Sequence, residues 1–229
     1  MSLKKAGKLL RLLANGRYRR ALAKGVAAAI EHEEALGEAN VDTVVDIGAN
    51  KGQFALVASK HWPQASLIAF EPIPEAATKF RAVFDGEPNV TLHEFAIGDA
   101  AGSAELHLSE RQDSSSLLPI GELQESVFPG TGEVGTIEIS VCRLGDLVAA
   151  DDIAGEALLK LDVQGFELQA LRGCEELLSR FRHVYVECSY IELYEGQALA
   201  DDVAAYLADQ GFAQTRQFNL VTTSDGTEV

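Results

Sequence analysis

Four carboxylates stand at the ends of apolar runs that we expect to form buried strands, namely Asp46, Glu71, Asp162 and Glu187. The carboxyl ends of parallel strands meet at one edge of a sheet, where open α/β folds bind their ligands. A carboxylate at that edge attracts a cationic group, such as an α-amino or sulfonium group, and repels phosphate. It can also take a proton from a hydroxyl group as a general base. These residues therefore point to a ligand that carries amino, sulfonium or hydroxyl groups.

The turn that follows Asp46 narrows the class of ligand. Gly48 and Gly52 are four residues apart, and Asn50 stands where the dinucleotide fingerprint G-x-G-x-x-G has its middle glycine. Glycine permits positive φ and the close approach of a ligand, and the helix that follows offers free N–H groups. An adenosyl amino acid, which has no phosphate to place here, suits the turn better than a dinucleotide, although a turn without a ligand is the simpler alternative. The residues of this turn expected to contact the ligand are Asp46, Gly48, Ala49, Asn50, Gly52 and Phe54, and Pro72 and Asp162 at two other strand ends are expected contacts as well.

The next two strand ends complete the expected nucleoside site. Glu71, followed by Pro72, lies 23 residues after the first glycine of the turn. An acid at about this distance accepts hydrogen bonds from ribose hydroxyls, whereas a solvated strand-end glutamate is the alternative. The residues expected to hold the adenine are Ile97 against the ring, Gly98, and Asp99 near the amino group.

The fourth strand carries the candidate catalytic residues. Lys160 and Asp162 share a strand face, and a lysine in a core strand needs Asp46 or Asp162 as a partner because an unpaired buried charge is costly. Lys160 can keep Asp162 ionised, so Asp162 is the first candidate for the general base, ahead of Glu167 and Glu187. The alternatives are a structural ion network around the lysine and, for Glu167, a helix-dipole role. These acids could hold a divalent metal, but their spacing does not require one.

Strands and helices alternate along most of the chain, as in a doubly wound α/β fold. Strands are expected at 43–47, 66–70, 90–96, 158–163 and 183–187, and helices at 54–61, 75–84, 168–179 and 201–210. Antiparallel strands are expected at 103–108 and 136–141, and a closing hairpin at 212–218 and 219–223. The stretch 109–135 is rich in Ser, Gly and Pro and is expected to be a mobile lid, with its tip, 113–118, above the carboxyl ends of the sheet. We divide the chain into a helical extension, 1–40, and one α/β domain, 41–229.

The charge distribution limits the possible partners. The net charge is −16, but eight of the 19 Lys and Arg residues lie in the first 25 residues, which contain no acid. The other 11 basic residues face all 35 acids, so the body of the protein carries a charge of −24. Such a body repels nucleic acid, and we expect a small hydroxylated molecule as the acceptor.

The basic N-terminal segment has helical periodicity in its apolar residues, Leu3, Ala6, Leu10 and Leu13. We expect these residues to pack on the acidic body; contact with an anionic membrane, a partner or a second copy of the chain is the alternative. No stretch approaches the roughly 18 apolar residues of a transmembrane segment, and arginines interrupt any signal peptide. We therefore expect a cytoplasmic protein. Its three cysteines, Cys142, Cys174 and Cys188, fit reduced and buried thiols.

Several stretches together carry a family resemblance. They are Val45–Phe54, Phe70-Glu71-Pro72, Ala96–Asp99, Ser115-Ser116-Leu117 and Leu159–Glu167, with the pattern K-x-D-x-x-G-x-E in the last. In these residues, over about Val41 to Glu195, the chain resembles the FkbM family of S-adenosylmethionine-dependent methyltransferases. The resemblance implies the Rossmann-like class I methyltransferase fold, with a seven-stranded sheet in the order 3-2-1-4-5-7-6, and Ser116 as a further cofactor contact. Gln164 departs from the family, which often has Glu there.

The same resemblance implies S-adenosylmethionine as the methyl donor and a transferase activity, mostly O-methylation of sugars and natural products. We therefore expect methylation of a hydroxyl on a sugar-like or polyketide-like molecule, with Asp162 central to the chemistry. The alternatives are an NAD(P)-dependent oxidoreductase, which would want the missing middle glycine, and a non-catalytic module that keeps the cofactor fold as a scaffold.

Overall fold

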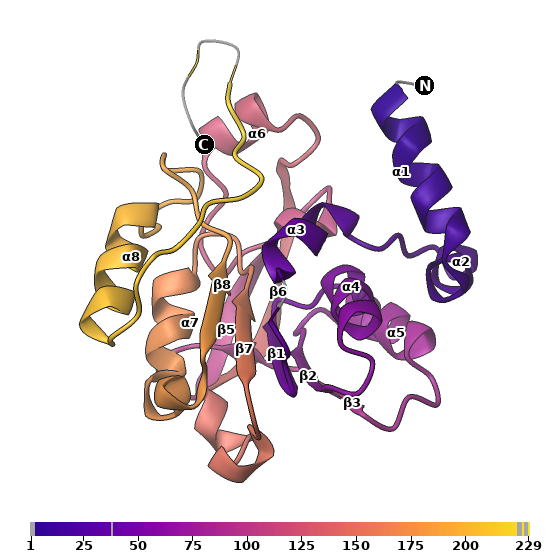
Figure 1. The fold of residues 1–229 in the computed structure, drawn as a ribbon. Coiled ribbons are helices and arrows are strands. Elements are labelled where there is room, and N and C mark those ends of the chain that lie inside the picture. Colours follow the sequence, from indigo (N-terminus) through magenta and orange to yellow (C-terminus); the bar gives the residue numbers. More distant parts are fainter. Residues whose placement is uncertain (1–2, 38, 224–225, 227–228) are drawn as a thin grey trace.

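A five-stranded parallel sheet forms the centre of the computed structural model, which describes residues 3–37, 39–223, 226 and 229 (Figure 1). Its order is β3-β2-β1-β7-β8, from β1 (Thr43–Ile47), β2 (Ser66–Phe70), β3 (Val90–His93), β7 (Ala157–Leu161) and β8 (His183–Val186). The chain first winds outward from β1 to β3 and later returns to add β7 and β8 on the other side of β1. The topological switch point, where such folds bind ligands, therefore lies between β1 and β7.

Helices cover both faces of this sheet (Figure 1). One face carries α4 (Gln53–His61) and α5 (Pro74–Val83); the other carries α7 (Glu167–Gly173), the 3-10 helix Glu175–Arg180 and α8 (Ala200–Asp209). Successive strand residues point to opposite faces. Accordingly, Val44 belongs to the core under α4, and its neighbour Val45 belongs to the core under α7. The α/β class that the sequence predicted is confirmed.

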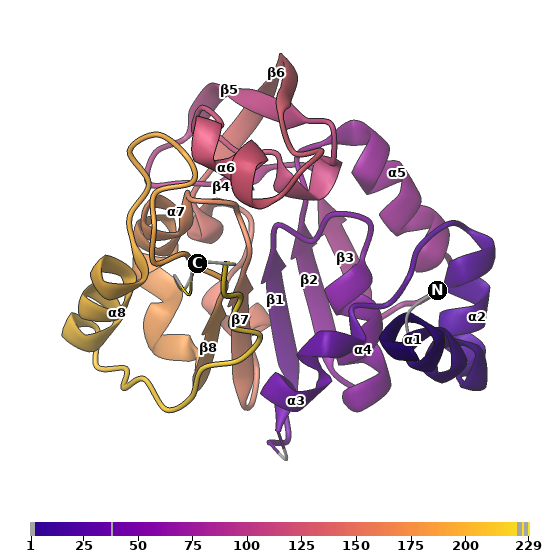
Figure 2. The same cartoon turned by 90° about the horizontal axis from the view of Figure 1, so that it is seen from above.

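A second, three-stranded sheet lies beside the main one (Figure 2). It has the order β4-β6-β5, from β4 (Ala96–Ile97), β5 (Gly102–Ser109) and β6 (Glu133–Cys142). The expected antiparallel pairing of β5 with β6 is confirmed. The single strand expected at 90–96 is wrong, because the chain leaves the main sheet after His93 and pairs Ala96 with Val141 of β6 instead.

The connection between β5 and β6 contains the 3-10 helix Gln112–Ser114 and α6 (Glu122–Val127). After β6, two more 3-10 helices, Leu144–Asp146 and Ala150–Asp152, lead to β7.

The described part of the chain contains no closing hairpin. Its central sheet therefore has the first five strands of the expected order 3-2-1-4-5-7-6 and lacks the last two. The described residues from Phe212 to Thr223 contain no strand, and most of their side chains are exposed, including Leu220 and Val221. A strand register is specified only where one face is buried. The segment expected to form this hairpin therefore has no buried face that would specify a strand register.

The N-terminal residues form α1 (Leu3–Ala14), α2 (Gly16–Ala23), the 3-10 helix Ile30–His32 and α3 (Glu33–Leu36). Leu12 is buried, whereas Leu10 and Leu13 are 69% and 45% exposed, so the expected packing of these two leucines on the body is wrong. The side chains of Leu3 and Ala6 lie outside the part that is described.

Buried residues of the extension, including Tyr18, Ile30 and Leu36, share one core with β1 and α4. The boundary at residue 40 stays a prediction. Within the described ranges, no helix is long and apolar enough to span a membrane. The three cysteines are free; Cys142 and Cys174 are buried, and Cys188 is half-buried.

Candidate active site

The turn after β1 is held by protein contacts. Gly48, Asn50 and Gly52 all have positive φ, at +77°, +48° and +89°. The N–H groups of Gly48 and of the buried Ala49 both donate to the carbonyl of Phe70, at 3.0 Å. A Cβ on Gly52 would lie 2.6 Å from the Phe84 ring. Positive φ is thus confirmed at both glycines, and Ala49 and Gly52 support the turn by packing inside it.

Glu71 lies across this turn and is only 4% exposed. One of its oxygens accepts a hydrogen bond from the Asn50 N–H and the other from the Ile73 N–H, each at 2.8 Å. Burial raises the pKa of Glu71 to about 7, against the lowering effect of these two bonds. Asn50 Oδ1 is also buried and has no hydrogen-bond partner within the described residues. Each carboxylate oxygen keeps a lone pair, so a carboxylate and an amide oxygen are available together for donors of a ligand.

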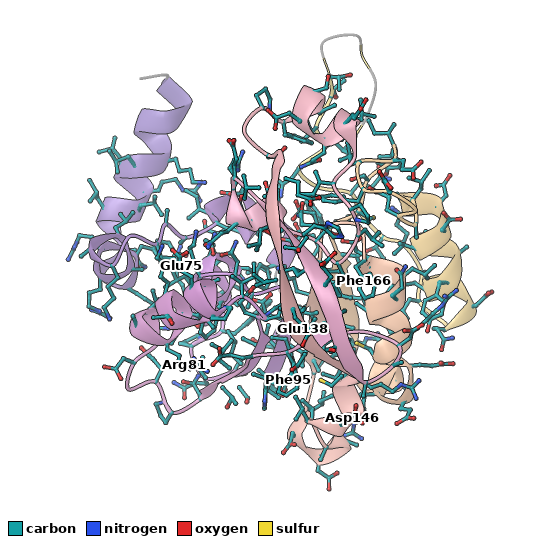
Figure 3. All side chains as sticks on the ribbon, turned by 180° about the vertical axis from the view of Figure 1, so that it is seen from behind. Glu75, Arg81, Phe95, Glu138, Asp146 and Phe166 are labelled. Atoms are coloured by element: carbon teal, nitrogen blue, oxygen red, sulfur yellow. The ribbon has the colours of Figure 1, made fainter. Side chains whose placement is uncertain are left out.

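A narrow cavity opens beside Glu71. Phe95 and Phe166, which line it, lie beside the β5–β6 hairpin in Figure 3. Seven of the expected contacts line this cavity: Gly48, Asn50, Glu71, Pro72, Ile97, Ser116 and Asp162. Its further walls include apolar Ile47, Phe70 and Leu117 and polar Gln112, Asp113 and Ser115.

Other expected contacts lie outside the narrow cavity. Asp99 is exposed and lines neither the narrow cavity nor the larger one described below, and Gly98 is packed between Val141 and Phe166. Gln112 and Asp113 instead supply polar groups to the wall of the narrow cavity. The sequence placed the loop tip that begins at Asp113 above the strand ends, but it assigned neither residue to the ligand, because nothing in an irregular loop marks which polar side chains turn inward.

Lys160 is the buried centre of the ion network that the sequence suggested. Its Nζ lies 3.1 Å from Asp46 Oδ1, 3.6 Å from Asp162 Oδ2 and 3.3 Å from the carbonyl of Gly48. Burial disfavours its charged form, but Asp46, Asp162 and Glu187 outweigh that effect and raise the pKa of Lys160. Asp46 is completely buried and lines neither cavity. Its partner in this structure is therefore Lys160, which also lies close to Asp162 at the end of β7.

Asp162 lies at the switch point with both oxygens engaged. Oδ2 faces Lys160, and Oδ1 accepts a hydrogen bond from Gln164 Nε2 at 2.7 Å. The Gln164 Oε1 accepts one from the hydroxyl of buried Tyr194, also at 2.7 Å, and that hydroxyl lies 3.0 Å from the carbonyl of Ser114. Ser116 donates to the Gln164 carbonyl at 2.6 Å. The 109–135 segment is therefore tied to the residue beside Asp162; its expected mobility stays a prediction.

The other two candidate bases differ in their surroundings. Glu167 is buried, and its Oε1 accepts hydrogen bonds from the N–H groups of Val163 and Gly165 in its own turn. Burial raises the pKa of Glu167 to about 7. Glu187 lines a second, larger cavity. The negative charge of Asp162 is the main cause that raises the pKa of Glu187, to about 8, and partial loss of solvent adds to it. Among the described residues, no group of three or more His, Cys, Asp or Glu is placed to hold a metal ion.

The larger cavity, of about 1510 Å³, adjoins the narrow one. The two share five lining residues, namely Gly48, Asn50, Asp113, Asp162 and Gln164. Ala49, Phe54, Lys160 and Glu167 line the larger cavity alone. Asp162 thus stands where a small apolar slot meets a space that could hold a second, bulkier molecule.

Both ends of the chain contribute to the walls of the larger cavity. Its lining includes Ala27–Ala29, His32 and Leu36 from the extension and Phe212–Val221 from the C-terminal segment. In Figure 1, α3 and the yellow C-terminal segment lie at the end of the sheet where β8 finishes. His32 was missed in the sequence because a lone histidine ahead of the first strand has no pattern that would mark it.

Comparison with known proteins gives consistent similarities. Residues 46–213 match the methyltransferase FkbM domain. The chain is 32% identical to the 2-O-methyltransferase NoeI of Sinorhizobium fredii, over 67% of this chain and 66% of NoeI. It is 31% identical to the 31-O-demethyl-FK506 methyltransferase FkbM of Streptomyces tacrolimicus, over 75% and 72% of the two chains. It is 28% identical to methyltransferase sdnD of Sordaria araneosa, over 78% and 80%. These similarities give no support to the oxidoreductase alternative.

Proposed function

The chain belongs to the FkbM methyltransferase family, and from that premise we propose that it transfers a methyl group from S-adenosylmethionine to a hydroxyl of a sugar-like or polyketide-like molecule. Members of this family are S-adenosylmethionine-dependent enzymes, so the chain is a methyltransferase. The observation that carries the rest of the proposal is the pair of adjoining cavities that share Asp162.

The lining of the narrow cavity, rather than its volume of about 70 Å³, matches the adenosine part of the donor. Glu71 is held by two backbone N–H groups and keeps free lone pairs for two ribose hydroxyls. The apolar walls from Phe70, Ile97 and Phe166 suit an adenine ring, and Asn50 Oδ1 offers an unpaired acceptor. When bound, S-adenosylmethionine supplies a methyl group already activated by its sulfonium sulfur.

The larger cavity fits the acceptor. Its volume of about 1510 Å³ exceeds the roughly 300–1,000 Å³ of an ordinary small-molecule pocket, which supports an acceptor larger than a single small ring. Tyr185, Tyr190 and Phe128 offer faces on which sugar or macrolide rings could pack. The names of NoeI and the FK506 methyltransferase specify O-methylation, which supports a hydroxyl as the acceptor group.

Asp162 is proposed to orient that hydroxyl. Lys160 and Gln164 fix its carboxylate from two sides, and its side chain is 28% exposed at the junction of the cavities. A group held in this way restricts the geometry of attack, which is the main requirement when the donor is already activated. We further propose that Lys160 keeps Asp162 ionised, because a nearby cation favours the charged form.

Isothermal titration with S-adenosylhomocysteine tests the donor site. Glu71→Gln should weaken binding by about ten-fold, because one ribose hydroxyl loses its charged acceptor. Asp99→Asn is the matched control: it removes the exposed acid that the sequence assigned to adenine and should leave the affinity unchanged. If Asp99→Asn weakens binding and Glu71→Gln does not, the narrow cavity is not the nucleoside site.

Methyl transfer itself is tested with radiolabelled S-adenosylmethionine and a panel of methyl glycosides and macrolides. Asp162→Asn should lower turnover on an accepted compound by about 10²-fold or more. Binding of S-adenosylhomocysteine must be measured on the same variant, because Asp162 also lines the donor cavity. An unchanged rate would remove Asp162 from the chemistry.

A further inference from the structure

His32 stands in the larger cavity although it precedes the part of the chain that matches the family, residues 46–213. Ile30, on the same 3-10 helix, is buried in the core under α4. The N–H of Ala29 donates to the carbonyl of Gln53, at 3.1 Å, in the first residue of α4. The extension is therefore anchored beside the glycine turn, and this anchor carries the histidine to the strand ends.

Three contacts fix the imidazole ring. Its Nδ1 lies 2.8 Å from the hydroxyl of Tyr185 on β8. The rings of Phe54 and Tyr185 meet it edge-on, with centroids 5.8 Å and 5.7 Å away. Phe54 in turn lies 5.4 Å from Nζ of Lys160. The ring is thus held against the same cluster that orients Asp162, and its Nε2 has no hydrogen-bond partner among the described residues.

The surroundings of His32 favour its neutral form. Burial lowers the pKa of His32, and the cations Lys160 on β7 and Lys8 on α1 lower it further. Glu31 on its own helix and Asp162 act in the opposite direction without cancelling the shift. Tyr185 completes the titratable groups that face it, and its oxygen also accepts a hydrogen bond from the side chain of Asn219. A neutral imidazole at neutral pH can accept a proton.

We infer that His32 is the general base of the methyl transfer, supplied by the N-terminal extension; this rests on the proposed function. The acceptor oxygen forms its bond to the methyl carbon as the carbon–sulfur bond breaks, and the sulfur keeps that electron pair. The hydroxyl proton passes to His32 Nε2 and later to water. This needs the tautomer in which Nδ1–H donates to the Tyr185 oxygen and Nε2 carries no proton.

The acids are less suited to this step. Lys160 and Gln164 already engage the two oxygens of Asp162. The nearby charge of Asp162 raises the pKa of Glu187 and so disfavours its ionised, proton-accepting form. Glu167 binds two N–H groups of its own turn through Oε1. His32 therefore divides the work with Asp162: the acid orients the hydroxyl, and the imidazole takes its proton.

The first test needs no acceptor. The pKa of each histidine is measured by NMR on the whole chain, saturated with S-adenosylhomocysteine and then with S-adenosylmethionine. A nearby sulfonium charge disfavours an imidazolium. The His32 signal, assigned from its loss in His32→Gln, should have a pKa at least half a unit lower with S-adenosylmethionine. His61, which lies outside both cavities, should be unchanged. Equal His32 pKa values with the two ligands would overturn the inference.

The second test uses a methylated compound from the panel. His32→Gln should lower turnover by about 10²–10⁴-fold and should remove the rise of rate with pH that the wild type shows through the His32 pKa. Its affinity for S-adenosylhomocysteine should stay within two-fold of the wild type, and His61→Gln should behave as the wild type. If His32→Gln keeps the wild-type pH profile and rate, another group is the base. Failure of the proposed function is seen separately, as a wild-type chain that binds no S-adenosylmethionine.

Discussion

The carbonyl oxygen of Asp162 occupies the space beside Gly48 where any other residue would place its Cβ, only 1.8 Å from that position. Asp162 also donates its N–H to the carbonyl of Ile47, at 3.1 Å. The ends of β1 and β7 are therefore in direct backbone contact across the switch point. This contact holds the donor turn and Asp162 at one fixed separation, and it makes glycine necessary at position 48.

Gly48→Ala should destabilise the fold on the order of 3 kcal/mol, because the new methyl group both clashes with a backbone atom and holds a positive φ. Gly196→Ala is the matched control: Gly196 has φ +73°, but a Cβ there meets nothing within 4 Å. Urea denaturation should show a loss of about 1 kcal/mol for the control. Equal losses in the two variants would mean that the β1–β7 contact relaxes without cost.

Lys160→Met should cost roughly 3–5 kcal/mol of stability, because it leaves the fully buried Asp46 without its cation. The double variant Asp46→Asn/Lys160→Met removes both charges and should recover most of this loss. A double-mutant cycle of unfolding free energies measures the coupling. Losses that simply add would show that the two groups do not depend on each other.

Stability should fall as the pH rises from about 5 to 8, and Glu167→Gln should reduce that fall. The pKa of Glu167 is about 7 in the folded chain, against an ordinary value of 4.5. Its stabilising contribution is therefore complete below about 4.5 and is lost as the pH passes 7. The difference corresponds to about 3 kcal/mol. Unfolding free energies at pH 5 and pH 8 check this, with Glu176→Gln, at an exposed position, as the control. A variant with the wild-type pH dependence would contradict it.

Tyr194→Phe should loosen the 109–135 segment, because it removes the hydroxyl that joins Ser114 and Gln164. Hydrogen exchange should show lower amide protection around residues 112–118 than in the wild type, and a smaller gain when S-adenosylhomocysteine is added. Tyr190→Phe removes a hydroxyl that contacts only the exposed Gln217, and it should have little effect. If the ligand leaves the protection of the wild-type segment unchanged, the segment is not a lid.

Much of the central sheet could be predicted because buried parallel strands are nearly continuous apolar runs. Thr43–Ile47 and Ser66–Phe70 have the expected bounds. The pairing of Lys160 with Asp46 and Asp162 followed from the cost of burying a lone charge, and it is confirmed. These inferences required only the local pattern of apolar residues and the knowledge of which strands lie side by side in such a sheet.

What could not be predicted depends on contacts between distant segments. His32 faces the site because Ile30 and Ala29 are anchored on α4, more than 20 residues later in the chain. The position of the loop tip above the strand ends was expected, but the inward direction of the Gln112 and Asp113 side chains, which line the narrow cavity, was not. In the C-terminal segment a hairpin was expected, but the strand register had no buried face to specify it. Local periodicity contains no information of this kind.

Backbone strain in the described part of the chain is concentrated around the larger cavity. Among the described residues, three that are not glycine have positive φ, namely Asn50, Gln164 and Asn219, and all three line that cavity. Asparagine tolerates this conformation, whereas glutamine pays more for it. A directed-evolution library for new acceptors should therefore allow only Asn, Asp or Gly at positions 50 and 219 and should leave position 164 unchanged. The varied positions should be Phe128, Tyr190 and Arg216, which line the same cavity and are not among the residues with positive φ.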